Sequence, residues 1–197
     1  MTEKLNEEPS LKPRMTADER QRYGELASDA SNILEFGAGG STLLAFQNGV
    51  QTVTSVESDK LWLDRLRTHP AMATYVQSGA WQPVHADIGE VGSWGKPVDK
   101  SHIEDWPNYH RAVWDRFPRA YDLVLVDGRF RIACAMQAAI RAPQSTLVFH
   151  DFYLRPFYEP VLDVYDVAER VDDMAILSLK ATPNAASILE EHASDPR

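Results

Sequence analysis

The stretch that decides the fold is residues 32–42, which read Asn-Ile-Leu-Glu-Phe-Gly-Ala-Gly-Gly-Ser-Thr. Ile33, Leu34 and Phe36 form a short apolar run typical of a buried strand, and three glycines within four residues follow it. Glycine tolerates positive φ and places no side chain between the backbone and a ligand. We therefore predict a strand, a glycine turn and a helix capped by Ser41, with room for a small ligand against bare backbone.

Two kinds of ligand fit this turn. Glu57 closes the next strand 20 residues after Gly37, the spacing at which an acid binds the ribose diol of a dinucleotide or of S-adenosylmethionine. Charge separates the two ligands. Glu35, two residues before Gly37, would repel a pyrophosphate and attract an ammonium or a sulfonium group. Thr42 also replaces the third glycine of the dinucleotide pattern.

Composition limits the class of protein. A chain of 197 residues with 44% hydrophobic residues suits one well-buried domain. The formal charge of −9 disfavours a nucleic-acid or anionic-membrane partner. Cys134 has no second cysteine to pair with, the first residues lack an apolar signal, and no apolar run approaches the roughly 18 residues of a membrane span. We expect a cytoplasmic protein.

The chain alternates strand-like and helical segments. We predict a flexible arm at residues 1–14, a catalytic domain at 15–182 and a polar tail at 183–197 whose last residues fray. A capping box at Thr16–Glu19 starts a first helix that ends near Ser28. Strands are predicted at 51–57, 82–86, 123–126, 145–149, 167–171 and 175–180, and an alanine-rich helix holding Cys134 as a buried hydrophobe is predicted at 131–140.

Residues 88–119 interrupt the alternation. The segment is long for a connection in a compact α/β domain, and it contains Trp94, Trp106 and Trp114. Such loops are usually functional or disordered, and three tryptophans argue against disorder. We interpret the segment as a lid on the substrate side, with ordinary surface packing as an equal alternative.

The string from Glu35 to Thr42 resembles the first motif of class I S-adenosylmethionine-dependent methyltransferases, whose pattern is acidic-x-Gly-x-Gly. The strands that end in Asp127 and in His150-Asp151 extend the resemblance over about residues 16–180. It implies a Rossmann-like, doubly wound, mostly parallel seven-stranded sheet with helices on both faces. It also implies S-adenosylmethionine as cofactor, with a small bacterial-type subgroup as the nearest likeness. The cofactor residues so implied are Glu35, Gly37, Gly39, Ser41, Thr42 and Glu57, with Asp87 beside the adenine.

Methyl transfer to an oxygen needs a group that removes the acceptor's proton, and Asp127, His150 and Asp151 end neighbouring strands at the same edge. We predict His150 as base, oriented by Asp127 or Asp151. A divalent cation on these three residues is the less favoured alternative. The more distantly similar catechol-type O-methyltransferases carry Asp-Asn where this chain has His150-Asp151. A third alternative is that both residues only bond turn amides.

The predicted activity is O-methylation of a small molecule or a saccharide. Trp94, Trp106, Arg129 and Tyr153 are the candidate residues for binding the acceptor. An NAD-dependent oxidoreductase and a non-catalytic S-adenosylmethionine-binding module are the alternatives. The oligomeric state is left open, with a homodimer as one option.

Overall fold

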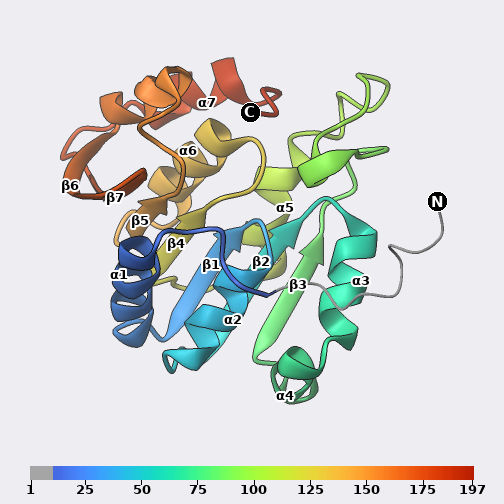
Figure 1. Cartoon of the computed structure of the whole chain (residues 1–197). Helices are drawn as coiled ribbons and strands as arrows, with labels where there is room; N and C mark the ends of the chain where they lie inside the picture. Colours follow the sequence, from blue (N-terminus) through green and yellow to red (C-terminus); the bar gives the residue numbers. More distant parts are fainter. Residues whose placement is uncertain (1–10) are drawn as a thin grey trace.

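The computed structural model describes residues 11–197, in which seven strands form one sheet (Figure 1). The strands are β1 (Asn32–Phe36), β2 (Thr52–Glu57), β3 (Trp81–His85), β4 (Leu123–Val126), β5 (Thr146–Phe149), β6 (Tyr165–Val171) and β7 (Met174–Leu179). Their order across the sheet is β3-β2-β1-β4-β5-β7-β6. The order reverses between β1 and β4, which is where open α/β sheets bind ligands beyond the carboxyl ends of their strands.

The sheet is mixed. Strands β1 to β5 pair in parallel, whereas β7 runs antiparallel to both β5 and β6. The prediction of a mostly parallel seven-stranded sheet is confirmed in this form. Pro83 lies in β3, the edge strand, where the backbone N–H that proline lacks is not needed by a second neighbour.

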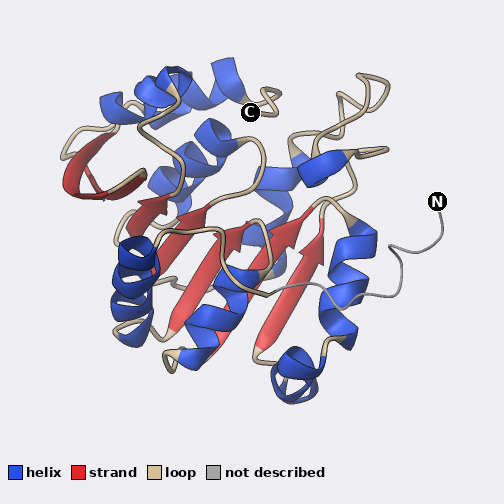
Figure 2. Ribbon diagram, in the orientation of Figure 1, coloured by secondary structure: helices blue, strands red, loops and turns tan. Residues whose placement is uncertain are grey.

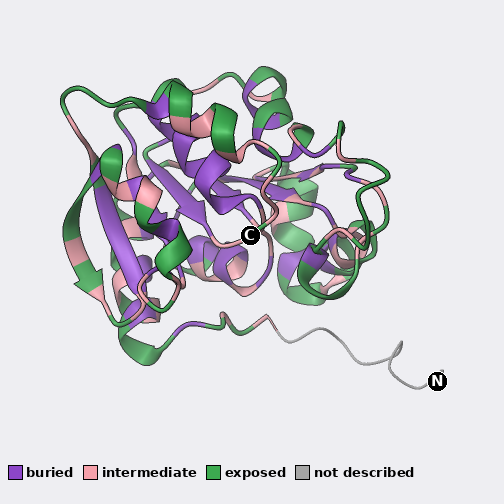
Figure 3. Ribbon diagram, turned by 90° about the horizontal axis from the view of Figure 1, so that it is seen from above, coloured by how far each residue is buried: buried purple, intermediate pink, exposed green. Residues whose placement is uncertain are grey.

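Helices cover both faces of the sheet (Figure 2). The α-helices are α1 (Ala17–Ser28), α2 (Gly40–Gln47), α3 (Lys60–Thr68), α4 (Ala73–Ser78), α5 (Asn108–Arg116), α6 (Arg131–Arg141) and α7 (Ala185–His192). Two separate hydrophobic clusters form as a result. Leu34 and Phe36 of β1 belong to the cluster with α5 and α6. Ile33, one residue before Leu34, points to the opposite face and belongs to the cluster with α1 to α3. The central strands are accordingly buried on both sides (Figure 3).

Cys134 illustrates the packing of α6. Its side chain is fully buried, its Sγ lies 3.4 Å from the carbonyl oxygen of Arg129, and burial raises the pKa of the thiol. The prediction that Cys134 is a small buried hydrophobe is confirmed. None of the helices in residues 11–197 is long and apolar enough to span a membrane.

Three local expectations were wrong. Helix α2 begins at Gly40, so Ser41 lies inside it and does not cap it. The tail does not fray, because α7 places Ala185 in the core, Ile188 and Leu189 pack beside it, and the carbonyl of Arg197 accepts a hydrogen bond of 2.9 Å from the N–H of Arg131. Part of the N-terminal arm is also packed, since Leu11 contacts the hydrophobic cluster of α1 to α3. The arm prediction for residues 1–10 lies outside the described residues.

The segment 88–119 divides into two parts. Trp106, Tyr109 and Trp114, the last two on α5, are at most 6% exposed and belong to the core. The earlier part projects beyond the carboxyl ends of the strands (Figure 1) and includes a short 3₁₀ turn at Ser93–Gly95, where Trp94 is 67% exposed. Only this earlier part has the exposure that a lid needs.

Candidate cofactor and catalytic site

The glycine loop after β1 presents backbone to its surroundings. Gly37 has a φ of +99° and Gly39 a φ of +159°, and the N–H of Gly37 donates to the carbonyl of Val56 at 2.8 Å. A Cβ atom on Gly37 would lie 3.0 Å from the backbone nitrogen of Gly128. The loops after β1 and β4 therefore touch, and glycine at both positions permits the contact.

Glu35 lies beneath this loop and is fully buried. Its carboxylate accepts hydrogen bonds from the hydroxyls of Ser41 (3.0 Å), Ser55 (2.5 Å) and Thr42. Burial raises its pKa to about 7. The oxygen of Thr42 in turn accepts from the N–H of Gly39 at 3.0 Å. The structure thus uses the side chains of Glu35, Ser41 and Thr42 to shape the loop, so what these residues offer a ligand is the position of the loop backbone.

Glu57 stands at the carboxyl end of β2, beside the loop. Its Oε1 accepts from the N–H groups of Ser58 (2.7 Å) and Asp59 (3.0 Å), and its Oε2 lies 3.4 Å from the N–H of Ala38. Burial raises its pKa. Asp87 shares this edge of the sheet but is exposed, and its Oδ1 accepts from the N–H of Gly89 at 3.1 Å. The structure joins Glu57 to the glycine loop and leaves Asp87 apart, in its own turn.

Two segments cover this edge. A Cβ atom on Gly40 would overlap the backbone nitrogen of Pro13, so residues 12–13 cross the start of α2 in direct contact. The carbonyl of Gly95 accepts from the hydroxyl of Ser58 at 2.9 Å. The guanidinium of Arg14 lies 4.2 Å from the centre of the Trp94 ring and joins the two segments to each other.

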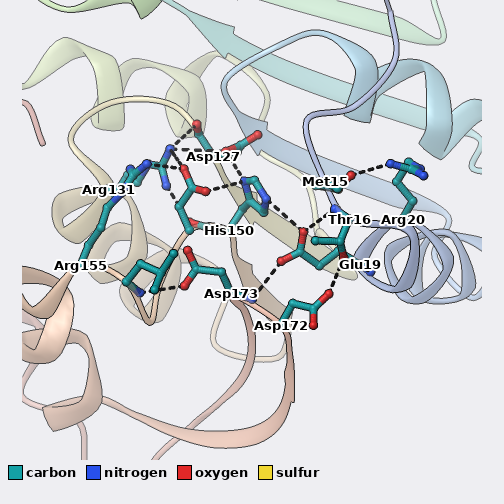
Figure 4. Close-up of polar contacts among 12 residues, drawn as sticks. Met15, Thr16, Glu19, Arg20, Asp127, Arg131, His150, Arg155, Asp172 and Asp173 are labelled. Carbon is teal, nitrogen blue, oxygen red and sulfur yellow. Dashed lines mark hydrogen bonds and ion pairs between the residues drawn. The ribbon is translucent and has the colours of Figure 1, made fainter.

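His150 follows β5 and is 5% exposed. Its Nδ1 lies 2.8 Å from Oδ1 of Asp127, and its Nε2 lies 3.5 Å from Oε2 of Glu19 on α1 (Figure 4). Burial lowers the pKa of the imidazole, but Asp127, Asp151 and Glu19 more than offset this and raise the pKa above its ordinary value. Carboxylates thus face both ring nitrogens, which favours the imidazolium form.

Arg131, at the start of α6, ties the ends of β4 and β5 together. Its guanidinium is buried and donates to the carbonyls of Gly128 (2.9 Å), Asp127 (2.9 Å) and His150 (2.6 Å). Its Nη2 also lies 3.4 Å from Oδ1 of Asp127 and 3.5 Å from Oδ2 of Asp151. The predicted catalytic residues therefore come together around a buried arginine (Figure 4).

Asp127, His150 and Asp151 are the residues that could bind a divalent cation in the metal alternative. One potential ligand atom from each residue lies within 4.8 Å of the others. However, Arg131 approaches both carboxylates, and Nη2 of Arg155 bonds Oδ2 of Asp151 at 2.6 Å. Two guanidinium groups already supply the positive charge that a divalent ion would bring. The residues present therefore do not fit a divalent cation.

The hydroxyl of Tyr23 is an unused donor near the loop. It is buried on α1 and has no hydrogen-bond partner among the described residues. Burial and the charges of Glu35 and Asp127 raise its pKa well above the ordinary value. A polar ligand between the ends of β1 and β4 can satisfy this hydroxyl, which together with the bare loop backbone fits a cofactor at this edge.

The four residues predicted to bind the acceptor are not gathered in one place. Trp94 is stacked on Arg14, and the Trp106 ring is 5.8 Å from that of Phe130. The backbone N–H of Arg129 donates to the Tyr109 hydroxyl at 3.3 Å. Tyr153 lies elsewhere, with the guanidinium of Arg170 4.0 Å from its ring centre.

Sequence reasoning missed Glu19 and Arg131 as parts of the site. Glu19 was predicted only as the capping-box acid, which it also is, because the N–H of Thr16 donates to it at 2.8 Å. Arg131 did carry a signal. A cation in the first turn of a helix opposes the helix dipole, so an arginine there indicates a specific partner.

The fold was compared with solved structures. A methyltransferase-like protein from Silicibacter pomeroyi DSS-3 superposes with a TM-score of 0.80 and is 29% identical over 95% of this chain and 100% of its own. The O-methyltransferase TomG from Streptomyces achromogenes, solved with S-adenosylmethionine, has a TM-score of 0.53 and 16% identity over 85% of this chain and 82% of its own. The chain shares the fold of class I methyltransferases. No family model and no curated protein sequence matches it.

The likeness to these methyltransferase structures confirms the resemblance drawn from the glycine motif. In this fold the glycine loop, Glu57 and the end of β4 lie at one edge of the sheet, as the sequence predicted.

Proposed function

We propose that the protein transfers the methyl group of S-adenosylmethionine to a hydroxyl oxygen of a small molecule or a saccharide. The observation that carries the proposal is the bare backbone at Gly37 and Gly39, held by the buried Glu35 and placed beside Glu57. The likeness to a methyltransferase-like protein at 29% identity supports it.

When bound, S-adenosylmethionine supplies an electrophilic methyl group. Gly37 and Gly39 let the chain approach the cofactor closely, and the remaining lone pairs of Glu57 accept hydrogen bonds from the ribose hydroxyls. Asp87 would lie on the adenine side, and the hydroxyl of Tyr23 would donate to a polar atom of the ligand. The segment around Trp94 excludes water from the closed site.

The acceptor's proton has to leave as the new bond to carbon forms. We first predicted His150 as the base, but its side chain is only 6% exposed and its ring nitrogens face carboxylates, whereas the Asp127 side chain is 33% exposed. In the proposed reaction Asp127 contacts the acceptor hydroxyl and takes its proton, and His150 is a positioning residue behind it. The nearby carboxylates of Glu19 and Asp151 stabilise the positive charge that the pair then carries.

The chemistry of the loop disfavours an NAD-dependent oxidoreductase, because Thr42 stands in place of the third glycine. A non-catalytic S-adenosylmethionine-binding module shares the cofactor residues but lacks methyl transfer. A cytoplasmic location and the absence of a nucleic-acid partner belong to the same proposal and rest on composition, and a bacterial origin rests on the resemblance to a bacterial-type subgroup.

Calorimetry tests the proposed function. We expect micromolar binding of S-adenosylhomocysteine and weaker or undetectable binding of NAD. Glu57→Ala should cost about 1–3 kcal/mol of binding free energy, the value of a hydrogen bond to a charged group. Arg65→Ala, which removes an exposed side chain on α3, is the control. Tighter binding of NAD than of S-adenosylhomocysteine would reject the proposal.

A screen for transfer of a labelled methyl group from S-adenosylmethionine to cell-extract acceptors then separates the enzyme from the non-catalytic module.

A further inference from the structure

Arg129 occupies an unusual position at the edge of the site. It follows Gly128, whose backbone touches Gly37 of the glycine loop, and its N–H donates to the Tyr109 hydroxyl. It therefore lies one residue beyond the contact between the loops after β1 and β4. A ligand group that reaches past the cofactor toward Asp127 comes close to this residue.

The guanidinium of Arg129 makes no hydrogen bond or ion pair within residues 11–197. Its Nε is buried and has no hydrogen bond among residues 11–197, and none of the ion pairs in that part of the chain includes Arg129. A buried donor without an acceptor costs free energy, and the cost is larger for a charged group. Such a group in a folded protein calls for an explanation, and a ligand outside the chain provides one.

The carboxylates nearby are already engaged. Asp127 faces Arg131 and His150, and Asp151 faces Arg131 and Arg155. Arg129 helps to lower the pKa of Asp127, but less than His150 and Arg131 do. Burial, then Arg131 and more weakly Arg155, lower the pKa of Arg129 itself, and its other close neighbours are the rings of Tyr109 and Tyr158. A guanidinium group without a hydrogen-bond partner, close to aromatic side chains, attracts an anion that carries an aromatic or other apolar body.

A second donor in the same aromatic cluster is also unsatisfied. The indole Nε1 of Trp106 is buried without a partner, and the Trp106 ring packs against Phe130, the residue after Arg129. Arginine and tryptophan side chains donate hydrogen bonds and accept none. Both unused groups therefore call for an acceptor, which an oxyanion supplies and an amine does not.

We propose that Arg129 binds an oxyanion, a carboxylate or a phosphate, on the methyl acceptor, so that the substrate is an anionic hydroxy compound. This inference rests on the proposed function, since it assigns the bound anion to the acceptor of that reaction. Planar guanidinium groups match both oxyanions in geometry, and the match fixes the orientation of the acceptor. The cofactor's own carboxylate is the other source of an oxyanion at this edge, and the experiment separates the two.

The test measures binding of benzoate, phenyl phosphate and neutral benzamide by calorimetry, with and without saturating S-adenosylhomocysteine. We expect one of the anions to bind at least about tenfold more tightly than benzamide, and Arg129→Gln to remove at least about tenfold of that affinity. Arg129→Lys should retain part of it. Arg111→Gln on α5, which removes an exposed arginine, should leave it unchanged.

Two further measurements on Arg129→Gln decide whether Arg129 binds the acceptor or the cofactor. Arg129→Gln should leave the affinity for S-adenosylhomocysteine within about twofold and raise the melting temperature, because it removes a half-buried charge whose Nε has no partner. Loss of S-adenosylhomocysteine binding in this variant would show that Arg129 binds the carboxylate of the cofactor, and would overturn the proposal. Equal binding of the anions and benzamide, no binding of either anion, or a lower melting temperature would also overturn it. Failure of the proposed function itself is visible separately, as wild-type protein that does not bind S-adenosylhomocysteine.

Discussion

Asp127 and His150 hold a single proton between a hydrogen-bonded carboxylate and imidazole, with Glu19 on the far side of the ring. This arrangement differs from an exposed histidine base, because the imidazole cannot reach an acceptor without leaving its partners. The pKa of Asp127 falls below its ordinary value despite burial, owing to the hydrogen bond and charge of His150. Substitutions of Asp127 and of His150 should consequently have different effects on the rate of methyl transfer.

For an acceptor found by the labelled-methyl screen, Asp127→Asn should lower the single-turnover rate of methyl transfer by about 10²–10⁴-fold, the usual contribution of a catalytic base. His150→Gln should lower it less and shift the pH profile, because it changes the charge next to Asp127. Chelator should leave both rates as they were. An unchanged rate in Asp127→Asn would remove this residue from the mechanism, and a chelator effect reversed by magnesium would establish a metal site after all.

Glu35 predicts a pH dependence of stability. Its folded-state pKa, raised by burial to about 7 from an unfolded value of 4.5, favours the protonated form in the folded protein. Its contribution to stability is therefore fully present below pH 4.5, and it is lost as the pH rises from there through 7. The raised pKa corresponds to roughly 3 kcal/mol between those limits. Denaturant unfolding of the wild type and of Glu35→Gln from pH 4.5 to 8 should show this difference, and parallel pH curves would contradict it.

At the level of elements, two short segments, residues 12–14 and 93–95, cover the edge of the sheet where the ligand site is proposed. Residues 12–14 lie on Gly40, residues 93–95 lie on Ser58 and Glu57, and Arg14 and Trp94 join them. An exposed cation–π contact contributes about 0.5–1 kcal/mol, which is small enough to open often. The lid prediction for residues 88–119 is thereby narrowed to the part before α5.

We expect Arg14→Ala to accelerate both association and dissociation of S-adenosylhomocysteine by about two- to fivefold, the factor that corresponds to the lost cation–π contact. Stopped-flow tryptophan fluorescence measures both rates, since Trp94 is exposed and should respond to closure. Arg65→Ala again serves as the control. Identical rates in Arg14→Ala and the wild type, or fluorescence that does not respond to the ligand, would show that this segment is not a lid.

The elements themselves were largely predictable from sequence. The apolar run Leu123–Val126 predicted β4, and the alternation at 175–180 predicted β7 to within one residue at each end, because buried strands leave a local pattern. The capping box at Thr16 predicted the start of α1, because its hydrogen bonds also join residues close in sequence. Helix α7 was missed, since only Ala185, Ile188 and Leu189 pack against the core and the rest of its turns are polar.

For the molecule as a whole, the sequence could predict which site residues end strands at the same edge of the sheet, but not which residues of the helices contact them. Parallel strands bring Glu57, Asp127 and His150 to one side whatever surrounds them, so their proximity follows from strand order. The contact of Glu19 with His150 and of Arg131 with Asp151 depends on how α1 and α6 pack. No local pattern specifies such tertiary pairs. The burial of His150, which changes its chemical role, could not be predicted from sequence for this reason.

Because Cys134 is fully buried, the rate at which a thiol reagent labels it can report opening of the structure. A thiol reagent attacks only a thiolate that it can touch, and here the sulfur faces the sheet from a helix that also anchors Arg131. Each labelling event therefore reports an opening of the structure that exposes the thiol of Cys134 on α6. Because Arg131 on the same helix bonds the carbonyls at the ends of β4 and β5, the rate of labelling measures how often this edge of the sheet opens, without an introduced probe.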